Sequence, residues 1–222
     1  MPYQQLLTQL KEAADESYKN FHKRLLKNDG IAVLGVRVPT LRKIAKQYKN
    51  SLDELLSFPD EYYEVTFVKL TAVSYLKYDE FIRYIDRCIP LINNWATCDC
   101  FVPKSIQNHR DEFLPYVLKY AEKEGEFYQR FSLVTLLHFY VEDKYLNLIY
   151  ALSEKCNTNL YYVHMAVSWL IAETLVKYYD RTITFLTTNS LDKKTHNKAI
   201  LKATESFRLS EDKKKFLKGL KR

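Results

Sequence analysis

The chain has 222 residues, of which 47% are hydrophobic, and it contains only 4 glycines and 6 prolines. Sandwiches and barrels of β-strands need many turns and usually contain more of both residues, so the composition argues against an all-β fold. The formal net charge of +7 favours a polyanionic partner such as nucleic acid, although a lysine-rich solvated surface gives the same charge.

The four cysteines form no C-x-x-C pair and have no companion histidine at zinc-ligand spacing; they are Cys88, Cys98, Cys100 and Cys156. We expect them to be reduced and packed as small apolar residues. The N-terminal segment has early acidic residues and no apolar core, so no signal peptide is predicted. No stretch reaches the roughly 18 apolar residues of a membrane span, and a cytoplasmic protein is expected.

Helical periodicity dominates from the start of the chain. Apolar residues recur every three or four positions from Tyr3 to about Lys27, which predicts one long first helix. The turn at residues 28–30 ends that helix, and residues 31–38 form an apolar connector rather than a strand. Pro39 fits the first turn of the next helix, because its missing N–H is not needed there.

The remaining chain is predicted to be helices joined by short loops, without a linker or a break in composition. Ser51 and Glu54 predict a capping box, and Ser210 predicts an N-cap. A single domain over residues 1–222 is expected. The further helices are predicted at about 60–77, 79–93, 95–108, 110–123, 126–141, 144–155, 159–179, 180–189, 193–206 and 210–220.

A weak internal repeat supports a stack of helix pairs. Residues 126–137 align without gaps with residues 160–171, so that Leu133 corresponds to Val167 and Leu136 to Leu170. Asp79-Glu80-Phe81 likewise recurs as Asp111-Glu112-Phe113. A period of 32–34 residues holds two short helices, which is typical of an all-α helical solenoid with a concave face.

The same repeat places cations at equivalent positions. Arg130, His164 and Lys198 are spaced by 34 residues, and Lys202 lies one helical turn after Lys198. The first three are predicted to form a basic stripe on the concave face, where cations could follow a DNA backbone, and Lys202 is predicted as a further DNA-binding residue.

No motif for a nucleotide or metal cofactor is present, and the five histidines share no ligand spacing, so no cofactor is expected. Trp95 and Asp99 are four residues apart and therefore share one helix face. Taken alone, such a tryptophan is more often a packing residue than a functional one.

Four residues in order resemble the AlkD family of alkylpurine DNA glycosylases: Trp95, Asp99, Arg130 in YQRFSL and Trp169 in MAVSWLIAE. The family pattern is a tryptophan and an aspartate four apart, an arginine on a later helix, and a tryptophan in an apolar helix. Residues 34–46 and 195–209 also resemble segments of this family and of related bacterial repair proteins. The likeness extends over nearly the whole chain.

The resemblance implies a HEAT-like repeat fold and hydrolytic release of cationic N3- or N7-alkylpurines from duplex DNA by a monomer. Asp99 would stabilise positive charge on the sugar, and the indoles of Trp95 and Trp169 would attract the cationic nucleotide. Arg130 would hold a backbone phosphate. The family is also expected to act without flipping the base out of the helix.

One departure from the AlkD pattern is predicted. In those glycosylases a short additional helix, which meets the DNA minor groove, lies between the first helix and the segment that corresponds to residues 34–46. A single helix over residues 3–27 leaves no room for it, which suggests a divergent branch. Two alternatives to the enzyme therefore stay open: a non-catalytic DNA-binding relative and a helical scaffold for another protein.

Overall fold

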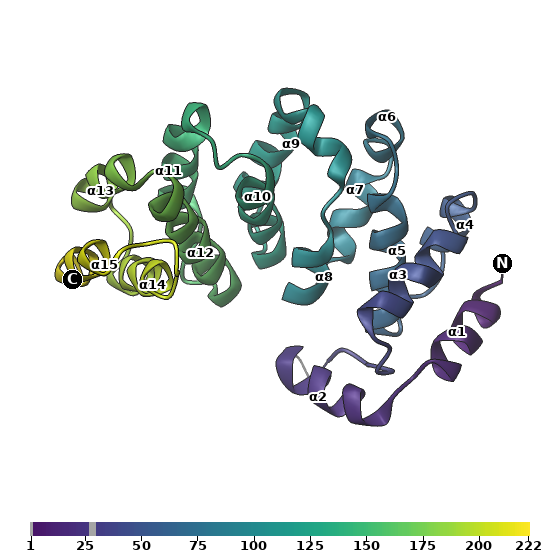
Figure 1. Ribbon diagram of the computed structural model, residues 1–222. Coiled ribbons are helices and arrows are strands. Elements are labelled where there is room, and N and C mark those ends of the chain that lie inside the picture. The colour runs from purple at the N-terminus through teal and green to yellow at the C-terminus, as the bar shows by residue number, and fades with distance from the viewer. Residues whose placement is uncertain (1, 27–29) are drawn as a thin grey trace. The chain divides into compact units, whose positions relative to one another are not determined.

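The computed structural model describes residues 2–26 and 30–222, and every regular element among them is a helix. The prediction of an all-α, helical-repeat fold is therefore confirmed for the described residues. The chain divides into two compact units, Met1–His109 and Arg110–Arg222, coloured purple to teal and teal to yellow in Figure 1. The prediction of one domain over residues 1–222 stays a prediction.

Unit 1 is built around α5, whose residues from Tyr63 to Val73 are all buried. Both polar and apolar faces of α5 are covered because α3, α4 and α8 pack on it. Fully buried Lys69 is paired with Asp60 at 3.0 Å and also donates to the carbonyl of Phe58. The elements of this unit are α1 (Tyr3–Glu12), α2 (Glu16–Leu26), α3 (Val38–Gln47), α4 (Leu52–Leu56), α5 (Tyr63–Ser74), α6 (Tyr78–Phe81), α7 (Ile85–Cys88), η1 (Ile89–Leu91), α8 (Trp95–Cys100) and η2 (Lys104–Asn108).

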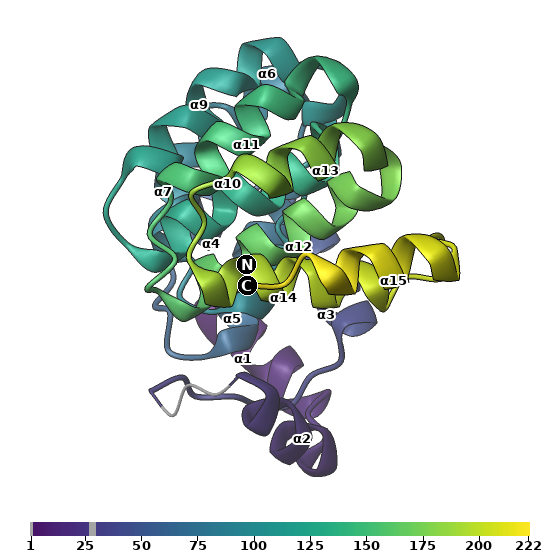
Figure 2. The same cartoon turned by 90° about the vertical axis from the view of Figure 1, so that its left-hand side faces the viewer.

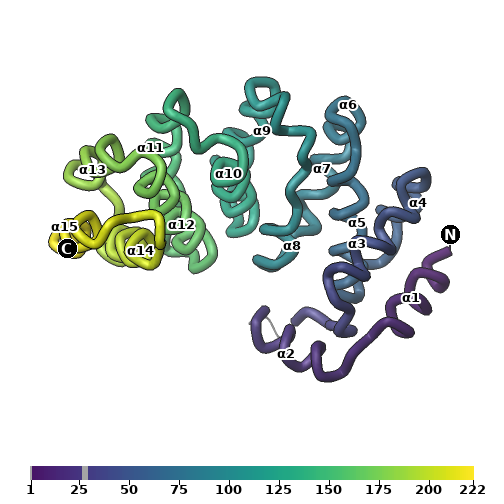
Figure 3. The backbone as a smooth tube through the Cα atoms, viewed as in Figure 1, coloured from purple at the N-terminus to yellow at the C-terminus, as the bar shows by residue number. Residues whose placement is uncertain are grey.

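The prediction of one continuous first helix is wrong, because the chain turns between α1 and α2 (Figure 3). The backbone N–H of Asp15 donates to the carbonyl of Gly35 at 3.1 Å instead of continuing the helix. Its carboxylate then accepts the N–H of Tyr18 at 2.9 Å and starts a new helix. A short helix thus occupies the interval in which the sequence left no room for one. The turn predicted at residues 28–30 lies mostly outside the described residues.

Two further predicted helices are divided. The segment 79–93 forms α6, α7 and η1, and Pro90 lies in the last of these. The segment 95–108 forms α8 and η2, separated by a stretch that includes Pro103. Proline lacks the N–H that a helix interior requires and disfavours helical backbone in the residue before it. The connector predicted over residues 31–38 is confirmed except for Val38, which begins α3, and Pro39 lies in the first turn of that helix as predicted.

Unit 2 has two layers of helices. In Figures 1 and 2, α9, α11 and α13 form one layer, and α10, α12 and α14 form the other. Within the second layer α12 packs on both α10 and α14. The elements are α9 (Arg110–Glu122), α10 (Glu126–Phe139), η3 (Asp143–Tyr145), α11 (Leu146–Lys155), α12 (Tyr161–Lys177), α13 (Tyr179–Thr188), α14 (Lys193–Thr204) and α15 (Glu211–Gly219).

The predicted repeat of about 34 residues is visible in the hydrogen bonds between successive helix pairs. Four bonds in unit 2 join partners 34 residues apart: Tyr145 to Asp111, Thr158 to Asp192, Arg181 to Asn147, and Tyr179 to the carbonyl of Lys213. The aligned apolar residues agree with the repeat, because Leu133, Val167, Leu136 and Leu170 are all buried. Phe81 and Phe113, from the other aligned pair of segments, are fully buried as well.

The capping predictions have different outcomes. The hydroxyl of Ser210 accepts the N–H of Lys213, so the predicted N-cap of α15 is confirmed. Ser51 precedes α4 but makes no side-chain capping bond, so the predicted capping box is wrong. Cys88, Cys98 and Cys156 are buried as predicted, whereas Cys100 is only half-buried.

Candidate functional site

Trp95 and Asp99 lie one turn apart on α8 in unit 1. The helix begins at Trp95 because the side chain of Asn94 accepts the N–H of Thr97 at 2.9 Å. It is only six residues long. Both Trp95 and Asp99 are half-buried, so the indole is not sealed in the interior and the carboxylate shares its helix face.

The indole of Trp95 is held by α2. Its Nε1 donates to the carbonyl oxygen of Leu25, in the last turn of α2, at 3.2 Å. Leu25 and Phe21 on the same helix are 43% and 51% exposed, which makes them two of the largest apolar side chains open to solvent in unit 1. This contact was not predicted because one helix was expected over α1 and α2. Asp15 followed by Glu16 is the N-cap signal that separates them.

A cation and a thiol lie close to the acid. Burial raises the pKa of the Cys100 thiol, and the positive charge of Arg42 and the negative charge of Asp99 act on it in opposite directions. Arg42 is exposed on α3. It is therefore a basic residue within electrostatic reach of the Asp99 neighbourhood, and the sequence analysis did not single it out.

Trp169 and Arg130 belong to unit 2. Trp169 is 44% exposed on α12, although its neighbours Ser168 and Leu170 are fully buried. Arg130 of α10 is buried, and its Nη1 donates to the carbonyl of Tyr162 at 2.8 Å. Its guanidinium also lies 5.7 Å from the centre of the Tyr162 ring. Arg130 thus fastens α10 to the first turn of α12, the helix that carries Trp169.

The predicted basic stripe is not a row of exposed cations. His164 is 3% exposed, and its Nδ1 is hydrogen-bonded to the hydroxyl of Thr195 at 2.8 Å. Burial lowers the pKa of His164, and Lys194 and Lys198 lower it further, so the imidazole is neutral near pH 7. His164 lies at the predicted repeat spacing from Arg130 and Lys198, but the close packing of α12 on α14 covers its side chain. His164 therefore presents no cation in this conformation.

The two lysines predicted to bind DNA, Lys198 and Lys202, lie on α14, and both are half-buried. The ammonium group of Lys202 pairs with Glu205 at 2.8 Å. Both lysines therefore lie partly at the surface of unit 2, unlike the buried His164. Of the residues predicted from sequence, Trp95 and Asp99 are thus brought together in unit 1, and Arg130 contacts the helix of Trp169 in unit 2. Convergence of the two pairs on one ligand stays a prediction.

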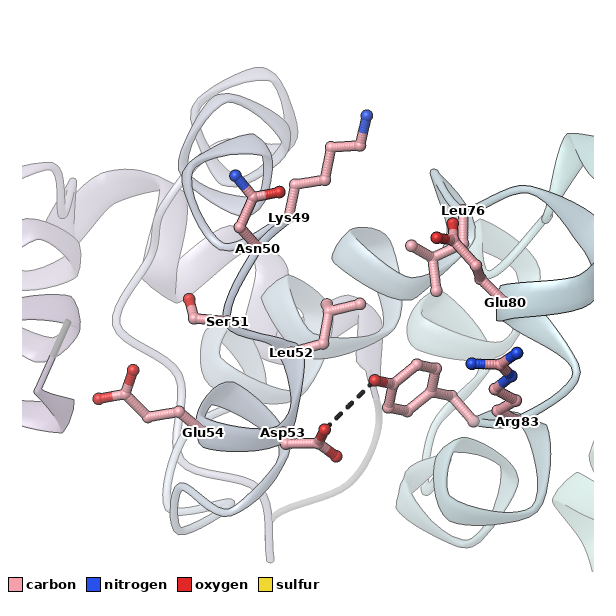
Figure 4. Close-up of a pocket in the computed structure, with 10 residues that line it drawn as sticks. Lys49, Asn50, Ser51, Leu52, Asp53, Glu54, Leu76, Glu80 and Arg83 are labelled. Carbon is pink, nitrogen blue, oxygen red and sulfur yellow. Dashed lines mark hydrogen bonds between the residues drawn. The ribbon is translucent and has the colours of Figure 1, made fainter.

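A cavity of about 300 Å³ in unit 1 contains none of the predicted site residues (Figure 4). Its wall has lysine, arginine and carboxylate side chains from α4 and the region of α6. Tyr84 donates to Asp53 across it at 3.4 Å, and Arg87 pairs with the same carboxylate. Opposite charges already neutralise one another there, so the cavity offers no single-sign field for a phosphate.

Within residues 2–26 and 30–222, no cluster of three or more histidine, cysteine or carboxylate side chains is arranged to hold a metal ion. In the same residues no helix combines the length and the hydropathy needed to span a bilayer.

Comparison with known proteins assigns the family. No curated protein is significantly similar to the chain. The family described as DNA alkylation repair enzyme, however, matches residues 4–207, which cover most of both units and include both pairs of site residues. The match extends over nearly the whole sequence, so the chain belongs to the DNA alkylation repair enzyme family.

Proposed function

We propose that the protein is a DNA glycosylase that hydrolyses the bond between deoxyribose and an N3- or N7-alkylated purine in duplex DNA. The observation that carries the proposal is the pairing of Trp95 with Asp99 on one face of α8, in a chain of the DNA alkylation repair family. An acid and an aromatic face are the two groups that a cationic nucleotide requires.

The chemistry needs only one carboxylate. An alkylated purine already carries positive charge, so it can leave with the electron pair of the glycosidic bond without protonation by a general acid. Positive charge then develops on the sugar, and water adds to the anomeric carbon with loss of a proton. Asp99 would stabilise that sugar cation electrostatically, unlike the paired carboxylic acids of glycoside hydrolases.

The aromatic side chains would supply selectivity for charge. An indole face attracts a cation through the ring quadrupole, and this attraction is largest for tryptophan. Trp95 and Trp169 are both accessible, which this role requires. Selection would then depend on the charge of the lesion rather than on a tight pocket for a flipped base.

Arg130 would hold a backbone phosphate through its forked N–H groups. It is 5% exposed in the unbound protein, so this role requires the guanidinium to turn outward when DNA binds. Lys198 and Lys202 would add contacts to the DNA backbone from α14. A monomer without a cofactor would suffice for these steps.

The helix α2 would be the element that meets the DNA minor groove. It lies where AlkD-like proteins have such a helix, and its last turn contacts the indole of Trp95. Exposed Phe21 and Leu25 provide apolar groups, and exposed Lys23 and Arg24 provide positive charge beside them. Apolar side chains with cations alongside are typical of minor-groove contacts.

The test is release of modified base from duplex DNA treated with a methylating agent. Asp99→Asn keeps the shape of the side chain and removes its charge, so the rate should fall by about a hundredfold to a thousandfold. Asp53→Asn is the matched control, because it alters a surface aspartate of the same unit and should leave the rate unchanged.

Equal and negligible release by the wild type and Asp99→Asn would reject the enzyme. Salt-sensitive DNA binding without release would then identify a non-catalytic relative. Absence of DNA binding at low salt would leave a helical scaffold for another protein.

A further inference from the structure

A fully buried carboxylate in unit 1 has no part in the proposed chemistry. Glu64, at the start of α5, is 0% exposed. Its oxygens accept three consecutive backbone N–H groups at 3.0, 2.7 and 3.3 Å, from Leu34, Gly35 and Val36. A buried charge is stable only when such donors replace water. Glu64 therefore fixes the conformation of the connector that precedes α3.

The connector in turn holds the start of α2. The carbonyl of Gly35 accepts the N–H of Asp15 at 3.1 Å. Gly35 has φ +96°, and a Cβ there would lie 2.5 Å from the carbonyl oxygen of Asp15. No side chain therefore fits between the two backbone segments. Arg37, the last residue of the connector, pairs with the Asp15 carboxylate at 2.9 Å.

Asp15 transmits this constraint to α2. Its carboxylate caps the helix through the N–H of Tyr18, and that bond together with the guanidinium of Arg37 lowers the pKa of the carboxyl. The guanidinium also lies 4.8 Å above the Tyr18 ring. The beginning of α2 is thus held by the bond from Asp15 to Gly35 and by the two contacts of Arg37. The end of the same helix provides the carbonyl of Leu25, which accepts the indole N–H of Trp95.

We propose that Glu64 is a positioning residue for Trp95. Through the connector at residues 34–36 and the capped helix α2, it sets the place of the one backbone oxygen bonded to the indole of the candidate site. Every contact in this sequence lies within unit 1. The proposal rests on the glycosylase function only for its rate measurement, because the environment of the Trp95 indole can be measured by fluorescence without any reaction.

The test replaces Glu64→Gln, which introduces an amide N–H₂ among three backbone donors. The chain has two tryptophans, so Trp169→Phe leaves Trp95 as the only indole fluorophore. In this background Glu64→Gln should shift the emission of Trp95 to longer wavelength and increase its quenching by acrylamide. With Trp169 intact, the rate of base release should fall by about tenfold to a hundredfold, as expected for a displaced binding group.

Asp60→Asn is the matched control. Asp60 also accepts bonds from α5, through Thr66 and Lys69, and neither bond involves the connector. It should lower stability without changing the emission or quenching of Trp95. If Glu64→Gln and Asp60→Asn give the same Trp95 spectrum as the background protein, the positioning role of Glu64 is wrong, whatever the rates are.

A milder variant covers the case in which Glu64→Gln does not fold. Asp15→Ala removes the cap of α2 and the partner of Arg37, and it should produce the same change in Trp95 fluorescence. Asp53→Ala, which removes another surface ion pair of unit 1, is its control. An unchanged Trp95 spectrum in folded Asp15→Ala would also reject the proposal. If no protein releases base but the spectra change as expected, the glycosylase function fails and the positioning role stands.

Discussion

The two units solve the packing of helices in different ways. Unit 2 repeats one pattern of helix pairs. Side-chain bonds such as Tyr145 to Asp111 and Arg181 to Asn147 join residues that are 34 positions apart. Unit 1 is irregular after α5, where α6, α7, η1 and α8 have 4, 4, 3 and 6 residues. The candidate acid lies in the irregular unit.

The difference has a physical reason. In a regular stack each helix is covered by its neighbours, so equivalent positions such as Arg130 and His164 become buried. Short helices expose their ends and keep fewer neighbours, and a carboxylate such as Asp99 can stay half-exposed there. The regular helix stack therefore buries Arg130 and His164, whereas the short helices of unit 1 leave the candidate acid accessible. Trp169 is the exception, as an exposed side chain within the regular layer.

The largest expected effect tests that exception. Leu170→Ala removes a fully buried side chain and should lower the free energy of unfolding by about 2–5 kcal/mol. Trp169→Ala, at the adjacent exposed position, should change stability far less while weakening binding to methylated DNA. Urea denaturation and a binding titration on both variants make the measurement. A Trp169→Ala protein as unstable as Leu170→Ala would mean that the indole is part of the core.

The next effect concerns a cap inside the regular layer. The carboxylate of Asp192 accepts the N–H of Thr195 at 3.0 Å at the start of α14 and the hydroxyl of Thr158 at 2.8 Å. Asp192→Ala should lower the free energy of unfolding by about 1 kcal/mol. Asp192→Asn can still accept the N–H and should recover most of the loss. Equal stability of the alanine variant and the wild type would show that the α12–α14 packing does not depend on this cap.

A pH dependence should distinguish the units. Burial lowers the pKa of His164 and His196 in unit 2 and of His22 in unit 1. The unfolded chain therefore binds more protons than the folded protein below about pH 6.5, and stability is lost as pH falls from there. Urea denaturation at a series of pH values should show this loss. The loss of stability at low pH should be smaller in the double variant His164→Gln/His196→Gln than in His22→Gln. Equal dependence of the unfolding free energy on pH in the wild type and both variants would contradict the assignment.

The smallest effect concerns contacts with the DNA backbone. Each phosphate contact contributes about 0.9 to the slope of log affinity against log salt concentration. Lys23→Ala in unit 1 and Lys198→Ala in unit 2 should each reduce the slope by about that amount. Lys155→Ala is the control. Lys155 lies on α11, in the layer that does not contain α14, and its ammonium group is paired with Glu122 at 2.6 Å. A slope changed by only one of the first two would assign DNA contact to that unit alone.

Several features followed from the sequence because they are local or periodic. The apolar period of 3.6 residues predicted α9, α10, α12 and α14 within a few residues of their observed bounds. Pro39 and Ser210 predicted helix starts, since a fixed backbone angle and a capping hydroxyl act on adjacent residues. The spacing of Trp95 and Asp99 fixed their common face for the same reason.

Tertiary structure decided the rest. The N-cap signal at Asp15 allows a helix to start there, but nothing within residues 3–27 shows that the N–H of Asp15 will bond to Gly35, and this contact across the fold holds the chain at the break between α1 and α2. The burial of His164 depends on α14 covering α12, although its charge-bearing ring suggested a surface cation. The sequence alone determined that the fold is helical and which residues repeat, but not where each helix is interrupted. Packing determined which of those residues meet solvent, because burial is a property of neighbours that are distant in the chain.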